Sequence, residues 1–385
     1  MVLILLLVVL LAPTAAWAQH EQHTTSPPPQ GWSTSAAAQA FVTLNLQQRK
    51  FNDVSQVEST NWVMGRVVRR SSRTKVTFIG MASAEPFTLR RLGSAQVFQA
   101  GETLDDLPLR DYQHPHDLVM SLTGRLDWQL NARHSVFATA GPVGSPALGP
   151  TAFMHRPSAL LHPTAPLSHH MLDSTHITHG VITVGATIGA WTVDASAFHG
   201  REPDEDRVGL DLGPIDSVSG RLSWRSGAWH AQVSGALVNE PERLEPGDTS
   251  KITASVEYVA PDGSDPTAWA WTAAIGRNGR SDHDEWGGLI EAVRRLTPRW
   301  RAYSRAELVD RFILVDFEHA IRTGRERHLL SRVGALTVGL ERSLSHGPLG
   351  QLATGIDVTV HHTPRNLRDS YGRPVSAHLY LRWNR

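Results

Sequence analysis

Apolar and polar residues alternate along most of the chain from about Phe41 onward. In the last segment the apolar positions are Val375, Ala377, Leu379, Leu381 and Trp383. The positions between them carry Ser376, His378, Tyr380 and Arg382. Successive side chains of a β-strand point to opposite faces, so this period of two predicts strands with one apolar and one polar face.

Sixteen segments carry this alternation, and Gly, Asn, Asp and Pro separate them. They lie at about 41–50, 58–70, 74–85, 118–130, 134–142, 175–188, 190–202, 216–226, 229–239, 250–260, 268–278, 284–296, 299–311, 330–343, 350–362 and 373–385. Most are longer than the roughly six residues usual for a strand of a soluble protein, and they are long enough to cross a bilayer at a tilt.

The connections between these segments alternate in length. Short ones lie at 71–73, 131–133, 189, 227–228, 297–298 and 345–348, with one of medium length at 261–267. Longer ones lie at 86–117, 143–174, 203–215, 240–249, 279–283, 312–329 and 363–372. Short turns on one side and long loops on the other predict an all-β fold, a transmembrane antiparallel β-barrel of about 16 strands (14–18). A secreted all-β domain is the alternative.

The N-terminal residues have the features of an export signal. Val2–Leu11 is an unbroken apolar run, and Ala16–Ala18 matches a small-residue cleavage site. We therefore expect a signal peptide at 1–18, a polar periplasmic linker at 19–40 and an outer-membrane barrel at 41–385. A membrane-anchoring helix is the alternative for the apolar run, although the run is short for a bilayer.

Composition agrees with a barrel. The 385 residues include 37 Lys and Arg, 37 Asp and Glu and no Cys, so the formal net charge is zero. A nucleic-acid partner is not expected, because phosphate binding needs an excess of positive charge. The absence of Cys excludes disulfides and thiol chemistry. Aromatic residues recur near the short turns, as in an interfacial girdle: Trp128, Trp191, Trp224, Trp229, Tyr258, Trp269, Trp271 and Trp300.

Five loop segments carry more specific motifs. They are Asp111–Asp117 (DYQHPHD), Gly141–Pro150 (GPVGSPALGP), Ala152–Ser158 (AFMHRPS), Asp173–Ile177 (DSTHI) and Gly200–Glu205 (GREPDE). In this order they resemble a family of largely uncharacterised bacterial outer-membrane β-barrel proteins, over about residues 41–385. The resemblance implies a bacterial outer-membrane location and a barrel fold. It also suggests a soft-metal role for a His- and Met-rich N-terminal tail, of which this chain keeps only His20 and His23.

Histidines concentrate in the two longest loops. Imidazole beside thioether is a donor mixture suited to copper, and imidazole alone also suits zinc. The candidate metal ligands are His114, His116, His155, His169, His170, Met154 and Met171. Turn capping and ion pairing are the alternative roles for these histidines.

Charged residues at inward positions are candidates for lumen selectivity. They are Arg125, Asp127, Arg221, Arg225, Arg301, Arg305, Asp357 and Arg382. The leading interpretation is a porin-like passive channel for small polar solutes or ions, in which loops 86–117 and 143–174 form the constriction. The alternatives are a closed barrel that binds copper or zinc, and a lipid-modifying barrel enzyme, although no catalytic motif is recognised. Expected partners are outer-membrane lipid, lipopolysaccharide and, through 373–385, the barrel assembly machinery, with both termini in the periplasm.

Overall fold

A computed structural model describes residues 30–385, apart from 51, 106, 244–246, 262–264, 282 and 313–329. The predicted signal peptide and the first half of the predicted linker, residues 19–29, therefore lie outside the described residues. Among the residues that are described, no helix has the length and apolar character needed to cross a membrane.

All strands except β5 and β6 form one closed antiparallel sheet. Most of them pair with the strands before and after them in the chain, β4 pairs with β7, and β1 pairs with β19. The wall consists of β1 (Gly31–Arg49), β2 (Asn52–Glu58), β3 (Asn61–Arg70), β4 (Thr74–Ala82), β7 (Val119–Gln129), β8 (His134–Gly144), β9 (Thr178–Ile188), β10 (Trp191–Phe198), β11 (Ser217–Ser226), β12 (Trp229–Val238), β13 (Thr249–Val259), β14 (Trp269–Gly279), β15 (Asp284–Arg295), β16 (Trp300–Arg311), β17 (Ser331–Gly347), β18 (Gly350–His362) and β19 (Val375–Asn384). Strands β2 and β3 both pair with β1 and share one position, so the barrel has 16 wall positions. The predicted barrel is confirmed.

One boundary of the prediction is wrong. The first strand begins at Gly31 rather than near Phe41, so residues 31–40 belong to the wall instead of the linker. The loop predicted at 86–117 lies in the long β4–β7 connection, which contains α2 (Glu85–Thr88) and a hairpin of β5 (Ser94–Leu104) and β6 (Leu107–Gln113).

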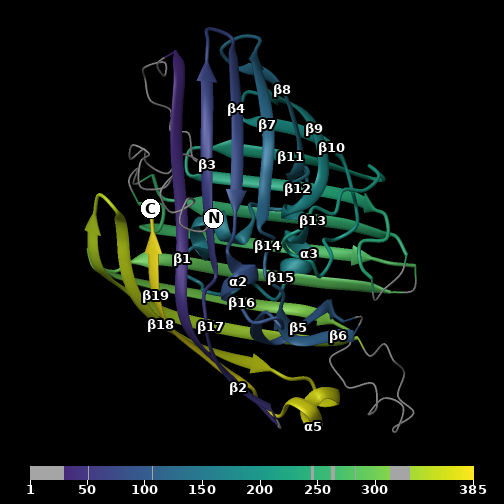
Figure 1. Ribbon diagram of the computed structural model, residues 1–385, viewed down its shortest axis with the longest axis vertical. Helices are drawn as coiled ribbons and strands as arrows, with labels where there is room; N and C mark the ends of the chain where they lie inside the picture. The colour runs from purple at the N-terminus through teal and green to yellow at the C-terminus, as the bar shows by residue number, and fades with distance from the viewer. Residues whose placement is uncertain are drawn as a thin grey trace.

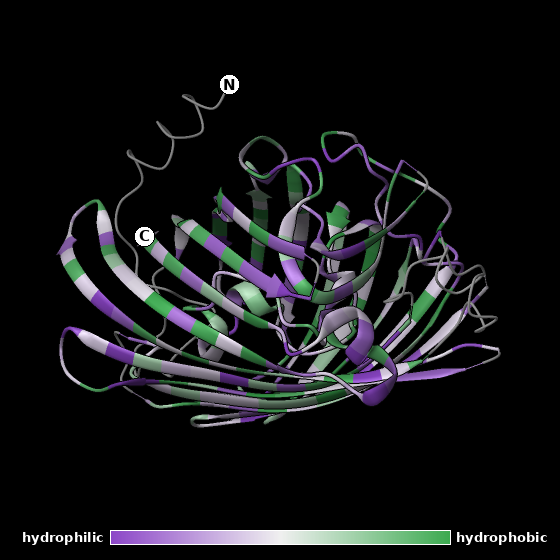
Figure 2. Cartoon of the chain, turned by 90° about the horizontal axis from the view of Figure 1, so that it is seen from below, coloured by the Kyte–Doolittle hydropathy of each residue, from purple (hydrophilic) through white to green (hydrophobic). Residues whose placement is uncertain are grey.

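The outer face of the barrel is apolar and the inner face is polar. In β18, Ile356 is 52% exposed whereas Asp357 is 2% exposed. In β19, Leu379 is 53% exposed whereas His378 is 4% exposed. Figure 2 shows the same alternation as bands of colour along the strands. A soluble protein buries its apolar side chains, so this inverted pattern is the one that a bilayer requires.

Aromatic residues cluster near the short turns, as predicted. The ring centroids of Trp229 and Tyr258 lie 5.0 Å apart, and those of Trp229 and Trp271 lie 5.6 Å apart. Trp128, Trp191 and Trp300 are also exposed near this end. These side chains match an aromatic girdle at a membrane interface.

Residues 145–177, here called the inner loop, fold into the barrel. The inner loop contains η1 (Phe153–His155), η2 (Pro157–Ala159), α3 (His169–Leu172) and η3 (Ser174–His176). Helix α3 contacts β13, β14 and β15, and η2 contacts β14 and β15. In Figure 1, α2, α3 and the β5–β6 hairpin lie within the outline of the barrel. A third connection, between β18 and β19, carries η4 (Arg365–Leu367) and α5 (Arg368–Tyr371).

Candidate functional site

A buried ion-pair cluster fixes the inner loop to the wall. Nε of Arg156 donates to Glu291 Oε1 on β15 at 2.5 Å, and Nε of Arg305 on β16 donates to Glu291 Oε2 at 2.8 Å. Ser158 Oγ also donates to Glu291 Oε1, at 2.9 Å. Arg156 and Glu291 are fully buried. Removing one partner from such a pair leaves a buried charge uncompensated, so this cluster strongly favours the inward position of the loop.

Apolar side chains of the inner loop reach several parts of the wall. Phe153 and Met154 pack in a cluster with Trp62, Met81 and Met120, on β3, β4 and β7. Other inner-loop residues pack against further strands: Leu148 with β9, β10 and β12, Leu161 with β1, β14, β15, β16 and β19, and Leu172 with β14 and β15. The inner loop therefore crosses the lumen and narrows it.

Two glycines form the seat of α3 on the wall. Gly276 and Gly287 are opposite each other on β14 and β15. A Cβ atom at Gly276 would lie 2.2 Å from the carbonyl oxygen of Met171, and one at Gly287 would lie 3.1 Å from Met171 Cγ. Any larger residue at Gly276 would therefore push α3 away from the wall.

The β5–β6 hairpin packs on the inner loop as a second inward element. Gln96 Nε2 donates to the carbonyl of Ala165 at 2.7 Å. Phe98 lies in a buried cluster with Leu167, Met171 and Val309. Both loops that were predicted to form the constriction thus contact each other inside the barrel.

The charged residues predicted to set selectivity face inward, and most of them are paired. Arg125 pairs with Asp127 at 2.7 Å, Arg221 with Asp194 at 2.8 Å, Arg301 with Asp265 at 2.8 Å, Asp357 with His378 at 2.6 Å, and Arg382 with Glu341 at 2.6 Å. Arg305 belongs to the Glu291 cluster, and Arg225 is exposed near the end of β11. Pairs of opposite charge close together leave small local fields rather than a lumen of one sign.

The predicted metal ligands are divided between several places. His116, His169 and His176 surround Phe153, with ring centroids 5.4 Å apart for His116 and His176 and 5.1 Å apart for His169 and His176. His155 packs against Trp62, and the half-buried His114 precedes His116 in its loop. Met154 and Met171 fill apolar clusters.

Carboxylates orient the imidazoles of this group. His116 Nδ1 lies 2.8 Å from Glu85 Oε2, and His169 Nδ1 lies 2.8 Å from Asp173 Oδ1. Burial alone would lower the pKa of His116, but the Glu85 carboxylate outweighs burial and holds that pKa above its ordinary value. Burial, reinforced by the charge of His116, lowers the pKa of His155 to about 4. His116 can therefore be charged at weakly acidic pH while His155 is neutral.

Asp173, Ser174 and His176 are close in sequence but do not form a Ser-His-carboxylate relay. His176 Nδ1 lies 2.7 Å from the backbone carbonyl of Asp173 rather than from its carboxylate. Ser174 Oγ donates to the carbonyl of His170. A hydrolytic triad needs the serine, the imidazole and the carboxylate in sequence, so Asp173, Ser174 and His176 do not supply one.

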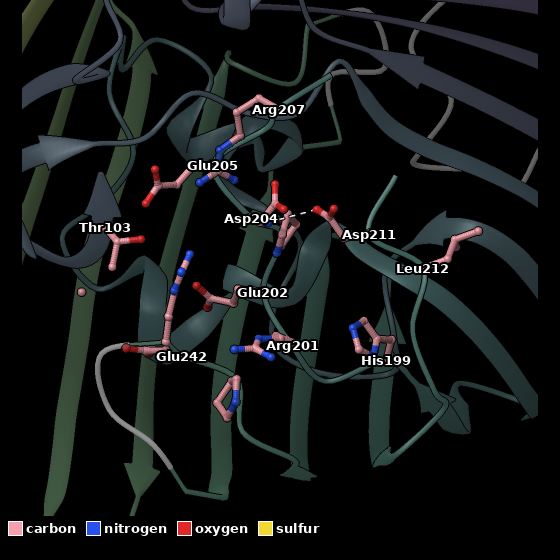
Figure 3. Close-up of a pocket in the computed structure, with 14 residues that line it drawn as sticks. Thr103, His199, Arg201, Glu202, Asp204, Glu205, Arg207, Asp211, Leu212 and Glu242 are labelled. Atoms are coloured by element: carbon pink, nitrogen blue, oxygen red, sulfur yellow. Dashed lines mark hydrogen bonds between the residues drawn. The ribbon is translucent and has the colours of Figure 1, made fainter. Parts of the chain in front are cut away.

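A cavity of about 460 Å³ lies at the long-loop end of the barrel. Connections β4–β7, β10–β11 and β12–β13 line it, and Figure 3 shows their charged side chains. Five carboxylates and three arginines contribute: Glu202, Asp204, Glu205, Asp211 and Glu242, with Arg201, Arg207 and Arg243. The excess of carboxylates favours cations at this entrance.

Sequence reasoning missed the roles of Arg156, Glu291 and Glu242. Glu291 had a usable signal, because the alternation in 284–296 puts it on the inward face between Ile290 and Ala292. Arg156 had none, because its partner lies 135 residues away across the barrel.

No protein-family model and no curated protein match the chain. Solved structures do match. The outer membrane channel DcaP of Acinetobacter baumannii is 10% identical, with 92% of this chain and 98% of that chain covered and a TM-score of 0.53. OmpF of Salmonella typhi, in complex with daunomycin, is 7% identical, with 91% and 97% covered and a TM-score of 0.55. OmpT of Vibrio cholerae, an outer membrane protein folded in vitro, is 6% identical, with 92% and 98% covered and a TM-score of 0.51. This protein therefore shares the fold of these outer-membrane barrels.

Proposed function

We propose that the protein is a porin-like passive channel of the bacterial outer membrane for ions and small polar solutes. The main support for this proposal is the closed barrel, which has an apolar outer face and a lumen that the inner loop crosses. The similarity of fold to DcaP, titled an outer membrane channel, supports the same interpretation.

The inner loop sets the size limit in this proposal. It contacts the wall at β3–β8 on one side and at β14–β16 on another, so solutes pass only beside it. Flow follows the concentration gradient, because no nucleotide-binding or catalytic motif is recognised in the sequence. The paired charges of the wall, such as Arg221 with Asp194, predict weak charge selectivity.

The orientation follows from the connections. The longer loops lie at one end of the barrel together with the short β1–β2 turn, and the other short turns lie at the opposite end. In outer-membrane barrels the short turns face the periplasm, which would put both ends of the wall there. The long loops would then face lipopolysaccharide, and β19 is the strand offered to the assembly machinery.

Solute flux into liposomes tests this proposal. Purified protein is reconstituted, and swelling is followed in sugars of increasing size and in salts. We expect uptake of ions and the smallest sugars, with a sharp loss for larger ones. Swelling no faster than that of protein-free liposomes in every solute would contradict a channel and favour the closed barrel.

A further inference from the structure

Three loops bring a histidine and two glutamates together at the cation-attracting entrance. His170 belongs to α3 of the inner loop, Glu202 to the β10–β11 connection and Glu242 to the β12–β13 connection. One potential donor atom from each lies within 4.8 Å of the other two. Within the described part of the chain, no other three His, Asp or Glu side chains meet this condition.

The geometry points to a binding site for a divalent transition-metal ion of the zinc class at His170, Glu202 and Glu242. One imidazole nitrogen with two carboxylate oxygens suits zinc, whereas calcium and magnesium prefer oxygen ligands alone. Three protein ligands leave one position of a tetrahedral ion for water.

The donors need only a small movement to bind. Bonds of about 2.1 Å in a tetrahedral site place the donor atoms about 3.4 Å apart, so the three atoms must approach by little more than an ångström. Glu202 and Glu242 are only partly buried, so their carboxylates can move. His170 is 4% exposed and holds a fixed place on α3, because its carbonyl accepts from Lys251 Nζ at 2.9 Å and from Asn278 Nδ2 at 3.3 Å.

Neighbouring residues direct the carboxylate of Glu242 toward the histidine. Arg280 Nη2 lies 3.2 Å from Glu242 Oε1, so Oε2 is the oxygen not engaged in that ion pair. A Cβ atom at Gly101 would lie 3.5 Å from His170 Cε1 and 3.9 Å from Glu242 Oε2, so both groups face the same point. The glycine of the β5–β6 hairpin therefore keeps this space clear.

The surrounding charge also suits a cation. Glu202, Glu242 and Glu285 lie within electrostatic reach of Lys251, together with Arg280. An ion here would join the inner loop to two outer loops at the entrance.

Zinc titration of the full-length mature chain in detergent tests the site. The test is made in a His20→Ala/His23→Ala background, because the N-terminal tail could bind zinc by itself. We expect one Zn²⁺ per chain, with Ca²⁺ and Mg²⁺ unable to displace it. Each of Glu202→Gln and Glu242→Gln should weaken binding more than about tenfold.

Matched variants separate the site from the general charge of the cavity. As controls, Glu205→Gln removes a carboxylate from the lining of the same cavity, and His199→Ala removes an imidazole from it. Both controls should bind zinc within about twofold of the parent's affinity, whereas His170→Ala should lose zinc binding. If His170→Ala does not fold, the two partly exposed glutamates decide alone. Absence of stoichiometric binding, or equal weakening by Glu205→Gln, would overturn the inference. The outcome is independent of solute flux, so it can fail while the channel proposal stands.

Discussion

Arg156→Met removes the buried ion pair that fixes the inner loop to the wall. Arg156 donates to Glu291 at 2.5 Å, to the carbonyl of Thr151 at 2.9 Å and to Asp173 Oδ2 at 3.4 Å. In the variant Glu291 keeps Arg305 at 2.8 Å, so the loss should fall near the lower end of the range for a broken buried pair, about 3 kcal/mol. Glu291→Gln leaves two buried guanidinium groups without their carboxylate and should cost about 5 kcal/mol.

The cost acts on the position of the inner loop, because Arg156 is the loop's side of the pair. A loss of 3 kcal/mol raises the released population about a hundredfold. Hydrogen exchange of the inner-loop amides should accelerate by a similar factor, and the channel current should show larger and noisier open levels. We expect the effect of Glu291→Gln to exceed that of Arg156→Met in both measurements.

Arg382→Met is the matched control. Arg382 forms a buried pair with Glu341 between β19 and β17, at 2.6 and 2.8 Å. Its loss should lower the unfolding temperature without accelerating exchange in the inner loop. If Arg156→Met leaves both exchange and current unchanged, or if Arg382→Met changes them as much, Arg156 does not hold the inner loop in place.

Three further outcomes are expected. Gly276→Ala should displace α3 from the wall and raise the channel current. The control Gly65→Ala should leave the current unchanged, because a Cβ atom at Gly65 meets nothing within 4 Å. Equal currents in the two variants would contradict the close packing of α3 on Gly276. Ile290→Arg, at a site 63% exposed on the outer face, should cost about 2–4 kcal/mol in lipid, and unfolding in lipid vesicles with Ile290→Leu as control measures it. The Glu85 carboxylate overcomes the effect of burial and raises the pKa of His116, while His116 overcomes burial and lowers the pKa of Glu85. The pair therefore stabilises the fold between the unfolded pKa values, about 4.3 and 6.5, and this contribution is lost as pH rises through the folded pKa of His116 or falls through that of Glu85. Raising the pH from 6 to 9 should therefore lower the unfolding temperature of the parent and of the control His134→Gln by more than that of His116→Gln. An equal decrease in all three proteins would contradict the proposed pair.

The wall could be predicted from sequence because each strand has a period of two. The start of β1 could not, since Ser33–Ala38 contains small residues without an apolar alternation. These residues join the wall through pairing with β3, as in Ser35 with Arg66. Register with a neighbour, rather than local pattern, extends the strand.

The interior was predicted less completely for a related reason. The two long loops were expected to fold inward, and they do. The contacts of these loops join residues that are far apart in sequence, such as Arg156 and Glu291, and no local pattern identifies such partners. The histidines illustrate the same limit, since His170 lies beside Glu202 and Glu242 although His169, its neighbour in sequence, pairs with Asp173. The spacing of residues along the chain does not show which residues come into contact across the barrel.

Single-channel recording in planar bilayers tests whether the barrel conducts and whether the inner loop narrows its lumen. The parent protein is compared with a variant in which residues 152–172 are replaced by a short Gly-Ser linker. We expect small discrete steps for the parent and clearly larger steps for the variant, because the inner loop narrows the lumen. Equal conductance in the two proteins, or no current from either while both are folded, would contradict it.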